Sequence, residues 1–255
     1  LKKDSEGSPI IVVFDAKGKT FRSDIYSEYK ANRPPMPDEL RDQLIPVKSI
    51  CRAIGFPLIE IEGVEADDVI ATISQMAKDA KYKCVISSLD KDLMQLVEDP
   101  HTTVMDTMKH KIFNEESVFE KFGVKPNQIR DMLALVGDAS DNIPGVPKVG
   151  QKTAAKWLNE YGDIQSIKDN ADSITGVVGE NLRNALDDID RNIELVSLKT
   201  NVDLNQKFED LLVFNPNDEE LDKIFSDLEF KSVNKGKQKE DKKKDSNYET
   251  VLDEK

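Results

Sequence analysis

Short apolar runs alternate with longer segments of helical spacing along the first half of this 255-residue chain. Runs typical of strands occupy residues 10–15 (IIVVFD), 57–62 (PLIEIE), 84–88 (CVISS) and 102–107 (TTVMDT). Between them, apolar side chains recur at helical spacing over 38–54, where Gly55 follows as a stop, and from 65 to about 80. This alternation predicts an α/β fold, with a doubly wound, twisted parallel sheet that carries helices on both faces.

The pattern changes after about residue 115, where helix-like segments separated by Gly and Pro follow one another. They are ESVFEKFGV, PNQIRDMLALVGD, GQKTAAKWLNEYG and GENLRNALDDIDRNIELVSL, and no convincing strand lies among them. Residues 203–231 add an acidic helical return, residues 232–247 lack apolar side chains almost entirely, and residues 248–255 resume a strand-like alternation. We therefore expect an α/β region at 1–114, a helical region at 115–231, a flexible linker at 232–247 and the start of a further domain at 248–255.

Composition indicates a globular protein without a membrane segment. No apolar run approaches the roughly 18 residues of a membrane span, and the first residues lack the apolar core of a secretory signal. The two cysteines and the two histidines lack the spacing of a metal site, so we expect reduced thiols and assign the histidines no chemistry. We expect a cytoplasmic protein and a monomer.

A basic strip interrupts the otherwise acidic chain, whose net charge is −13. Acidity of this degree is unusual for a nucleic-acid enzyme, because phosphate binding requires a basic footprint. Residues 17–33 supply one locally, and the prolines at 34, 35 and 37 stiffen the segment that follows. The cations of this strip are Lys17, Lys19, Arg22, Lys30 and Arg33, against Asp24 and Glu28. A solvated polar loop is the ordinary alternative.

Eight carboxylates gather in four short clusters, each beside an apolar segment at a predicted strand end or helix terminus. They are Asp15; Glu65, Asp67 and Asp68; Asp90 and Asp92; and Asp138 and Asp141. Hard carboxylate oxygens without histidine or thiol are what Mg²⁺ or Mn²⁺ accepts, and such crowding of anions is tolerable only where cations neutralise them. The clusters therefore predict a shared metal site and metal-assisted phosphodiester chemistry.

Taken singly, each acidic cluster has an ordinary structural explanation. Acidic residues in the first turn of a helix, as in GVEADD, complement the helix dipole. The DKD sequence fits a turn with a lysine salt bridge, and GDASDN fits an Asx-rich helix stop. The coincidence of four clusters on what should be one rim of one sheet favours the shared site.

A second candidate site lies in IPGVPKVGQKTAAKWL, where Gly145 and Gly150 bracket a turn that enters a helix at about Gln151. Backbone N–H groups at such a helix start can hold a phosphate without reading a base, and Lys148 and Lys152 add positive charge. A plain packing corner between two helices is the alternative. In the basic strip, Tyr29 is placed to stack on an unpaired base.

The segments VVFDAKGKTFR, YKANRPPMP, GVEADDVIAT, SLDKDLMQLV, LVGDASDNIPGVPKVGQKTA and LEF together resemble the 5′ nuclease domain of bacterial DNA polymerase I, within the flap endonuclease superfamily. The resemblance covers residues 10 to about 231. It implies a PIN-like catalytic unit, a helical arch and a helix-three-turn-helix element that binds duplex backbone together with K⁺. It places the metal ligands on the eight carboxylates, and the arch cations on Lys30 and Arg33, with Arg22 near them. It places the backbone and K⁺ site on the 145–153 loop, which includes Thr153.

The resemblance also implies an activity: 5′-3′ exonuclease and 5′ flap cleavage by two Mg²⁺ or Mn²⁺ ions, in primer removal and DNA repair. The substrate is DNA with a 5′ flap or a nicked duplex junction, and polymerase domains follow in the same polypeptide. Family members begin with a strand that carries a further metal aspartate in a VDGSS-like motif, which does not precede Leu1 here. We therefore expect a truncated catalytic region with weak or no activity alone. A non-catalytic junction-binding module and a PIN-like ribonuclease are the alternatives.

Overall fold

The computed structural model of the chain describes residues 7–230, which form two units. The larger unit lies within Leu1–Met36 and Pro57–Val213, and the smaller unit begins with Pro37–Phe56 and continues from Phe214. The predicted linker at 232–247 and the predicted start of a further domain at 248–255 lie outside the described residues. None of the helices in the described part of the chain is both long and apolar enough to cross a membrane.

The described residues of the smaller unit contain two helices, α2 (Asp38–Ile54) and α10 (Asp218–Asp227), which pack against each other. Helix α2 has the bounds that its apolar spacing predicts. It ends at Gly55, whose φ of +100° only glycine adopts readily, and a Cβ there would lie 2.6 Å from the backbone nitrogen of Pro216. Asn217 joins the two helices, because its backbone N–H donates to Ala53 O and its side chain caps α10 by accepting from Glu220 N.

The four predicted strand runs each contain a strand, but the strands form separate sheets. Strand β1 (Val12–Val13) pairs in parallel with β2 (Leu58–Ile59). Strand β3 (Cys84–Ser87) pairs in parallel with β4 (Thr102–Asp106), which pairs antiparallel with β5 (Lys111–Phe113). Strand β5 runs antiparallel because the short 107–110 turn is too brief for a crossover connection. The α/β class is confirmed, whereas one continuous parallel sheet is not present in residues 7–230.

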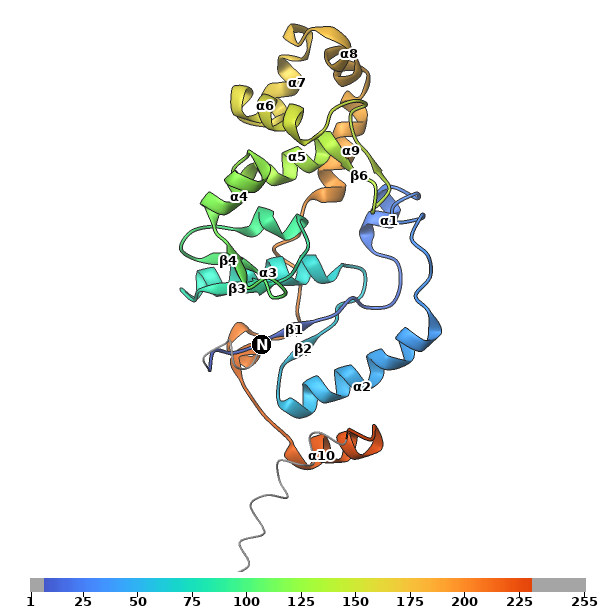
Figure 1. The fold of residues 1–255 in the computed structure, drawn as a ribbon, viewed down its shortest axis with the longest axis vertical. Coiled ribbons are helices and arrows are strands. Elements are labelled where there is room, and N and C mark those ends of the chain that lie inside the picture. The colour runs from blue at the N-terminus through green and yellow to red at the C-terminus, as the bar shows by residue number, and fades with distance from the viewer. Residues whose placement is uncertain (1–6, 231–255) are drawn as a thin grey trace, which may run out of the picture. The chain divides into compact units, whose positions relative to one another are not determined.

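Helix α3 (Ala66–Asp79) packs against β1 and β3, as Figure 1 shows, and has nearly the bounds predicted for it. Its buried face contributes Val69 and Ile73 to a core that also contains Phe208 and Leu211. The last two belong to a 3₁₀ helix, η4 (Phe208–Leu212). A second 3₁₀ helix, η1 (Asp92–Leu96), follows β3 closely. The carboxyl ends of β1 and β3 are therefore followed by the first and third acidic clusters.

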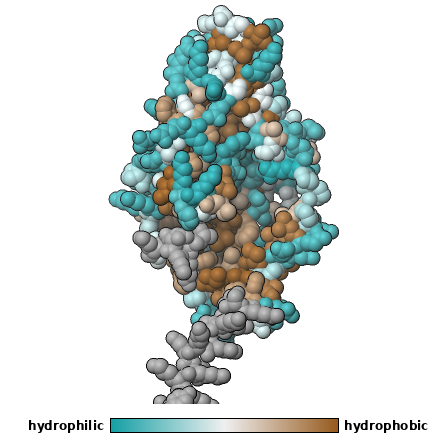
Figure 2. Space-filling model, in the orientation of Figure 1, coloured by the Kyte–Doolittle hydropathy of each residue, from teal (hydrophilic) through white to brown (hydrophobic). Residues whose placement is uncertain are grey.

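Helices dominate the chain after residue 114, as the sequence predicts. Those before η4 and α10 are α4 (Glu115–Phe122), η2 (Pro126–Gln128), α5 (Ile129–Val136), α6 (Gln151–Tyr161), α7 (Ile164–Asp169), η3 (Ala171–Ser173), α8 (Gly176–Asn184) and α9 (Leu186–Val196). Helix α9 packs on α5 and on α1 (Phe21–Ile25) of the basic strip (Figure 1). On the face drawn in Figure 2, hydrophilic residues predominate over the larger unit, with hydrophobic patches between them.

One pair of strands in this helical part was not predicted. Strands β6 (Gly137–Asp138) and β7 (Ile143–Pro144) pair antiparallel across the GDASDN segment. Two residues are too short for the alternation by which strands are recognised. The backbones approach closely here, because a Cβ on Gly145 would lie 2.0 Å from Val136 O and one on Gly137 would lie 2.3 Å from Gly145 N.

Replacing Gly145 by alanine should therefore lower the free energy of unfolding by about 1–3 kcal/mol, because the added methyl group forces the two backbones apart. Urea denaturation of the whole chain measures this. The matched control is Gly150→Ala in the same loop, since a Cβ there meets nothing within 4 Å and its φ is −107°. Equal unfolding midpoints for the two variants would show that the close approach is not a constraint.

Candidate active site

Seven of the eight predicted carboxylates line one cavity of the larger unit, with a volume of about 490 Å³. They are Asp15, Glu65, Asp67, Asp90, Asp92, Asp138 and Asp141. The cations Arg22, Lys30, Arg33 and Lys91 line it as well. The cavity therefore collects acidic and basic side chains from β1, the basic strip, the start of α3, the turn after β3 and the β6–β7 hairpin.

The first wall of the cavity forms where β1 ends beside the start of α3. Asp15 follows β1, and its Oδ1 accepts a hydrogen bond of 2.8 Å from the backbone N–H of Ala66, the first residue of α3. Glu65 occupies the N-cap position of α3, and Asp67 lies in the first turn. The positive end of the helix dipole favours carboxylates at these positions. Local helix chemistry therefore places three acidic side chains at one rim.

Asp68, the eighth carboxylate, does not line the cavity. Its Oδ2 and Oδ1 accept from Arg22 Nη1 at 2.6 Å and Nη2 at 2.8 Å, and it also accepts from the backbone N–H groups of Lys199 and Glu65. Arg22 donates further to Leu195 O at 2.7 Å and to Ser197 O at 2.8 Å. Both side chains are almost completely buried.

This buried pair changes the roles expected of Asp68 and Arg22. With its oxygens taken by Arg22 and two backbone N–H groups, Asp68 has a structural role here rather than that of a metal ligand, and Arg22 is committed to Asp68 rather than to a phosphate. Burial alone would raise the pKa of Asp68, but the hydrogen bonds and charge of Arg22 outweigh it and hold the pKa below its usual value. The pair fixes α1, α3 and the end of α9 to one another.

Tyr29 is buried, and the ring is not available to stack on a base as expected. Its hydroxyl lies 3.0 Å from Asp141 Oδ2 and 3.1 Å from Glu65 Oε2, and it donates its one proton to either carboxylate. Burial, followed by the charges of Glu65 and Asp141, raises the pKa of Tyr29 above its usual value. Tyr29 thus remains a hydrogen-bond donor that spaces two carboxylates from distant parts of the chain.

The two predicted arch cations hold the same two carboxylates. Lys30 Nζ lies 2.7 Å from Glu65 Oε1 and 3.7 Å from Asp141 Oδ2, and Arg33 Nη2 donates to Asp141 Oδ1. The Lys30 backbone N–H also donates to Asp141 O at 2.9 Å. Lys30 has a φ of +57°, an uncommon conformation for a residue with a side chain. The basic strip is therefore fastened to the β6–β7 hairpin by side chains and backbone together.

Asp90, Asp92 and Asp138 form the opposite wall with Lys91 between them. Asp90 Oδ1 accepts from the backbone N–H of Asp92 at 2.9 Å, which shapes the turn into η1. Asp138 Oδ1 accepts from Ser140 N at 2.7 Å, and its Oδ2 lies 2.8 Å from Lys91 Nζ. Lys91 and Ser140 were not among the predicted site residues. For Lys91, the available signal was its position between two site aspartates.

Two of the carboxylates have strongly raised pKa values. Burial, and then the charges of Asp90, Glu65 and Asp15, raises the pKa of Asp67 to about 7. Burial, and then the charges of Asp90 and Asp138, raises the pKa of Asp92 to about 7. Such values arise where anions crowd without enough cations to neutralise them.

The donor set fits divalent cations. When all are ionised, the seven carboxylates exceed Lys30, Arg33 and Lys91 by four negative charges, since Arg22 is offset by Asp68. Asp92 Oδ1 is buried and has no hydrogen-bond partner among the described residues. Within residues 7–230, however, no three His, Cys, Asp or Glu side chains have the arrangement that would hold a metal ion. Several oxygens are instead drawn to the lysine and arginine side chains.

The second candidate site lies outside this cavity. Lys148 and Lys152 are exposed, Gly150 is the N-cap residue of α6, and the backbone N–H of Thr153 donates to Gly150 O at 3.0 Å. Gly145 and Thr153 are half-buried, Lys152 and Thr153 lie in the first turn of α6, and Val149 anchors the segment in the core. The binding of a backbone phosphate at this loop stays a prediction.

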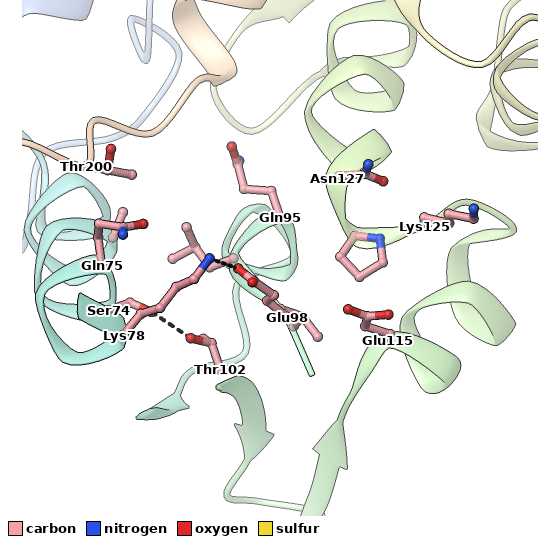
Figure 3. A pocket seen from close by; sticks show the side chains of 14 residues that line it. Ser74, Gln75, Lys78, Gln95, Glu98, Thr102, Glu115, Lys125, Asn127 and Thr200 are labelled. Carbon is pink, nitrogen blue, oxygen red and sulfur yellow. Dashed lines mark hydrogen bonds and ion pairs between the residues drawn. The ribbon is translucent and has the colours of Figure 1, made fainter. Parts of the chain in front are cut away.

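A second cavity, of about 420 Å³, is shown in Figure 3. Helix η1 contributes to both cavities, and Gln95 and Leu96 are its lining residues in this one. Its walls hold an ion pair of 2.6 Å between Lys78 and Glu98 and a hydrogen bond of 3.0 Å between Ser74 and Thr102. Its remaining charged side chains, Lys125 and Glu115, balance each other. It therefore lacks the excess of negative charge that distinguishes the acidic cavity.

Two family models match the chain in succession. The model described as 5′-3′ exonuclease, N-terminal resolvase-like domain, matches residues 1–123, and the model described as 5′-3′ exonuclease, C-terminal SAM fold, matches residues 124–220. The division that we expect between residues 114 and 115 stays a prediction.

Relatives of known name have similar sequences. The DNA polymerase I of Pseudomonas aeruginosa is 42% identical over 91% of this chain and 26% of the relative. The 5′-3′ exonuclease of Aquifex aeolicus is 40% identical over 91% of this chain and 79% of the relative. The chain thus spans about a quarter of the length of the polymerase relatives that it matches.

Solved structures show the same fold. The T5 5′-exonuclease with bound zinc has a TM-score of 0.68 and 26% identity, over 88% of this chain and 84% of that one. A T5 flap endonuclease variant, described as a pseudo-enzyme-product complex with DNA and metal ions, has a TM-score of 0.67 and 25% identity, over 88% and 85%.

Replacing Asp68 by alanine should lower the free energy of unfolding by about 3–5 kcal/mol, because Arg22 would remain buried without its partner. Chemical denaturation measures the loss. Asp172→Ala is the matched control, since Asp172 is an exposed carboxylate outside the cavity, and its removal should cost no more than about 0.5 kcal/mol. Similar losses in both variants would show that the Arg22–Asp68 pair does not hold the site together.

Adding Mg²⁺ should raise the melting temperature of the chain more at about pH 8 than at about pH 5. In the folded state, the pKa values of Asp67 and Asp92 are raised from 3.8 to about 7. The metal-free protein therefore loses stability as the pH rises from the ordinary pKa of an aspartate to about 7. A bound cation recovers this lost stability only at a pH where the two carboxyl groups are ionised. Thermal denaturation with Mg²⁺ or with EDTA measures the difference. Equal shifts at both pH values would contradict this account.

Proposed function

The chain belongs to the 5′-3′ exonuclease family, and we propose that it hydrolyses phosphodiester bonds of DNA at 5′ flaps and nicked junctions. The single observation that carries the proposal is the acidic cavity, where seven carboxylates from four segments leave an excess of four negative charges. This excess equals the charge of two divalent ions. We take these ions to be Mg²⁺ or Mn²⁺, because the donors are hard oxygens.

The carboxylates on the two walls of the cavity would hold these ions. When bound, the ions supply an activated water for in-line attack and stabilise the oxygen that leaves. Asp15, Glu65 and Asp67 serve on the α3 wall, and Asp90, Asp92, Asp138 and Asp141 on the opposite wall. Asp68, which the sequence also suggests as a ligand, instead orients the α3 wall through Arg22.

The basic side chains of the cavity act on the phosphate. Arg33 has 52% of its side chain exposed and Lys30 has 25%, so both can turn from their carboxylates toward a substrate. Their charges offset the negative charge that develops on phosphorus during attack. Tyr29 keeps Glu65 and Asp141 apart with its hydroxyl, which is a positioning role rather than a base-stacking one.

Duplex DNA is bound through its backbone at the 145–153 loop. Lys148 and Lys152 contact phosphates there, the start of α6 presents backbone N–H groups, and a K⁺ ion is expected to join them. Selectivity then comes from the shape of the junction, because contacts of this kind do not read bases. The T5 flap endonuclease complex with DNA and metal ions supports this substrate class.

In its cellular setting, we propose that the chain is the 5′ nuclease part of a DNA polymerase I in the cytoplasm, where it acts as a monomer in primer removal and repair. The similarity to the DNA polymerase I of Pseudomonas aeruginosa supports this. One observation favours the alternative of a non-catalytic junction-binding module: in the described chain, no three acidic side chains have the arrangement of a metal site. Cleavage of flap DNA with Mg²⁺ separates the two, and comparison with RNA tests a PIN-like ribonuclease.

Replacing Asp90 or Asp138 by alanine should reduce the rate of flap cleavage by at least about 10²-fold, because each supplies an oxygen where charge must be stabilised. DNA binding by these variants should persist, since the duplex backbone is held at the 145–153 loop. Single-turnover cleavage with Mg²⁺ gives the rate, and fluorescence anisotropy with Ca²⁺ gives the affinity. Asp172→Ala is again the control. Equal losses of rate and affinity would refute the catalytic assignment.

A further inference from the structure

Building on the proposed function, we propose that Lys91 is an internal counter-ion that competes with a divalent cation for Asp138 and so weakens metal binding on that wall. Lys91 Nζ lies 2.8 Å from Asp138 Oδ2. A cation that binds this oxygen must either displace the ammonium group of Lys91 or share the oxygen with it. The affinity of the site is then set by an exchange of one positive group for another rather than by the carboxylates alone.

The hydrogen bonds of Asp138 decide which of its partners can leave. Its Oδ1 accepts from the backbone N–H of Ser140 and from Ser140 Oγ, two residues further along the β6–β7 hairpin. These bonds hold the hairpin, and Asp138 itself is buried. Lys91, in contrast, has 44% of its side chain exposed, so it can turn into water without opening the fold. Oδ2 is therefore the oxygen that becomes available.

The surroundings of Lys91 contain a second oxygen that suits a cation. Asp92 follows Lys91 at the start of η1, and its buried Oδ1 has no hydrogen-bond partner among the described residues. Asp92 and Asp138 lie on the same wall of the cavity, and the negative charge of Asp138 acts on Asp92. When Lys91 turns away, Asp138 Oδ2 and Asp92 Oδ1 are both left to a cation.

Lys91 is held by fewer groups than Lys30 and Arg33, the other partly exposed cations of the cavity. Lys30 contacts Glu65 and Asp141, and Arg33 contacts Asp141 and Ser140 O, so each is held to more than one group. The one ion pair described for Lys91 is with Asp138. Removing its charge should therefore change metal binding at one wall without releasing the basic strip.

Titration calorimetry with Ca²⁺ on the whole chain tests this role. Lys91→Met keeps an unbranched side chain close to the length of the lysine stem and removes the charge, and it should bind Ca²⁺ about tenfold more tightly than the wild type. Lys91→Arg keeps the charge and should stay close to the wild-type affinity. Lys78→Met is the matched control, because Lys78 forms a 2.6 Å ion pair with Glu98 in the neighbouring cavity (Figure 3).

A double-variant comparison assigns the effect to Asp138. In the Asp138→Asn background, Lys91→Met should no longer tighten Ca²⁺ binding, because the oxygen for which the two cations compete has lost its charge. Lys91→Gln repeats the test with a second neutral side chain, and circular dichroism verifies that each variant is folded.

The outcomes separate this role from the proposed function. Unchanged or weaker binding by Lys91→Met, in a chain whose wild type binds Ca²⁺, overturns the counter-ion role and leaves the nuclease proposal standing. Weaker binding would mean that Lys91 holds Asp138 in place for the metal. Absence of Ca²⁺ binding in the wild type and in every variant overturns both.

Discussion

The repulsion among seven carboxylates in one cavity is the constraint on which the rest of the site depends. Isolated in a protein interior, such a cluster would stay protonated or force the fold open. Three of these carboxylates, Glu65, Asp141 and Asp138, form ion pairs with cations. The cations are Lys30, Arg33 and Lys91, respectively. These cations do not equal the carboxylates in number, and under the proposed function divalent ions neutralise the remaining negative charge.

The positive groups of the site fall into two kinds. Arg22 is buried, binds both oxygens of Asp68, and donates to two backbone carbonyls, so it belongs to the frame. Lys91 and Arg33 keep about half of their side chains exposed, so water can reach them beside their carboxylate partners. The buried Arg22–Asp68 pair holds the backbone behind the wall, and the exposed cations lie in front of it. That division suits a reaction in which negative charge shifts during each turnover.

Much of the architecture could be predicted from local pattern. The apolar spacing defined α2 as Asp38–Ile54, and the strand runs contain β1 to β4. Seven of the eight clustered carboxylates do line one cavity, although the single sheet rim expected to gather them is not present in residues 7–230. Strands β6 and β7 escaped prediction because a two-residue strand has no periodicity. The separation of the strands into small sheets depends on pairing between distant segments, which local spacing does not encode.

The roles of single side chains were the least predictable part. Asp67 and Asp68 are neighbours in sequence, yet one lines the cavity and the other is buried against Arg22. Tyr29 lies in an exposed-looking, proline-bounded segment and is nevertheless buried, because its hydroxyl lies within hydrogen-bond distance of both Glu65 and Asp141 and donates to one or the other. In each case the partner comes from a remote part of the chain.

A crystal structure of the chain grown with Mn²⁺, with anomalous scattering recorded, tests the central claim most directly. The account predicts two manganese peaks inside the acidic cavity, one beside Asp15 and Asp67 and the other beside Asp92 and Asp138. A cavity without manganese at saturating concentration, with Lys91 still paired with Asp138, would contradict it.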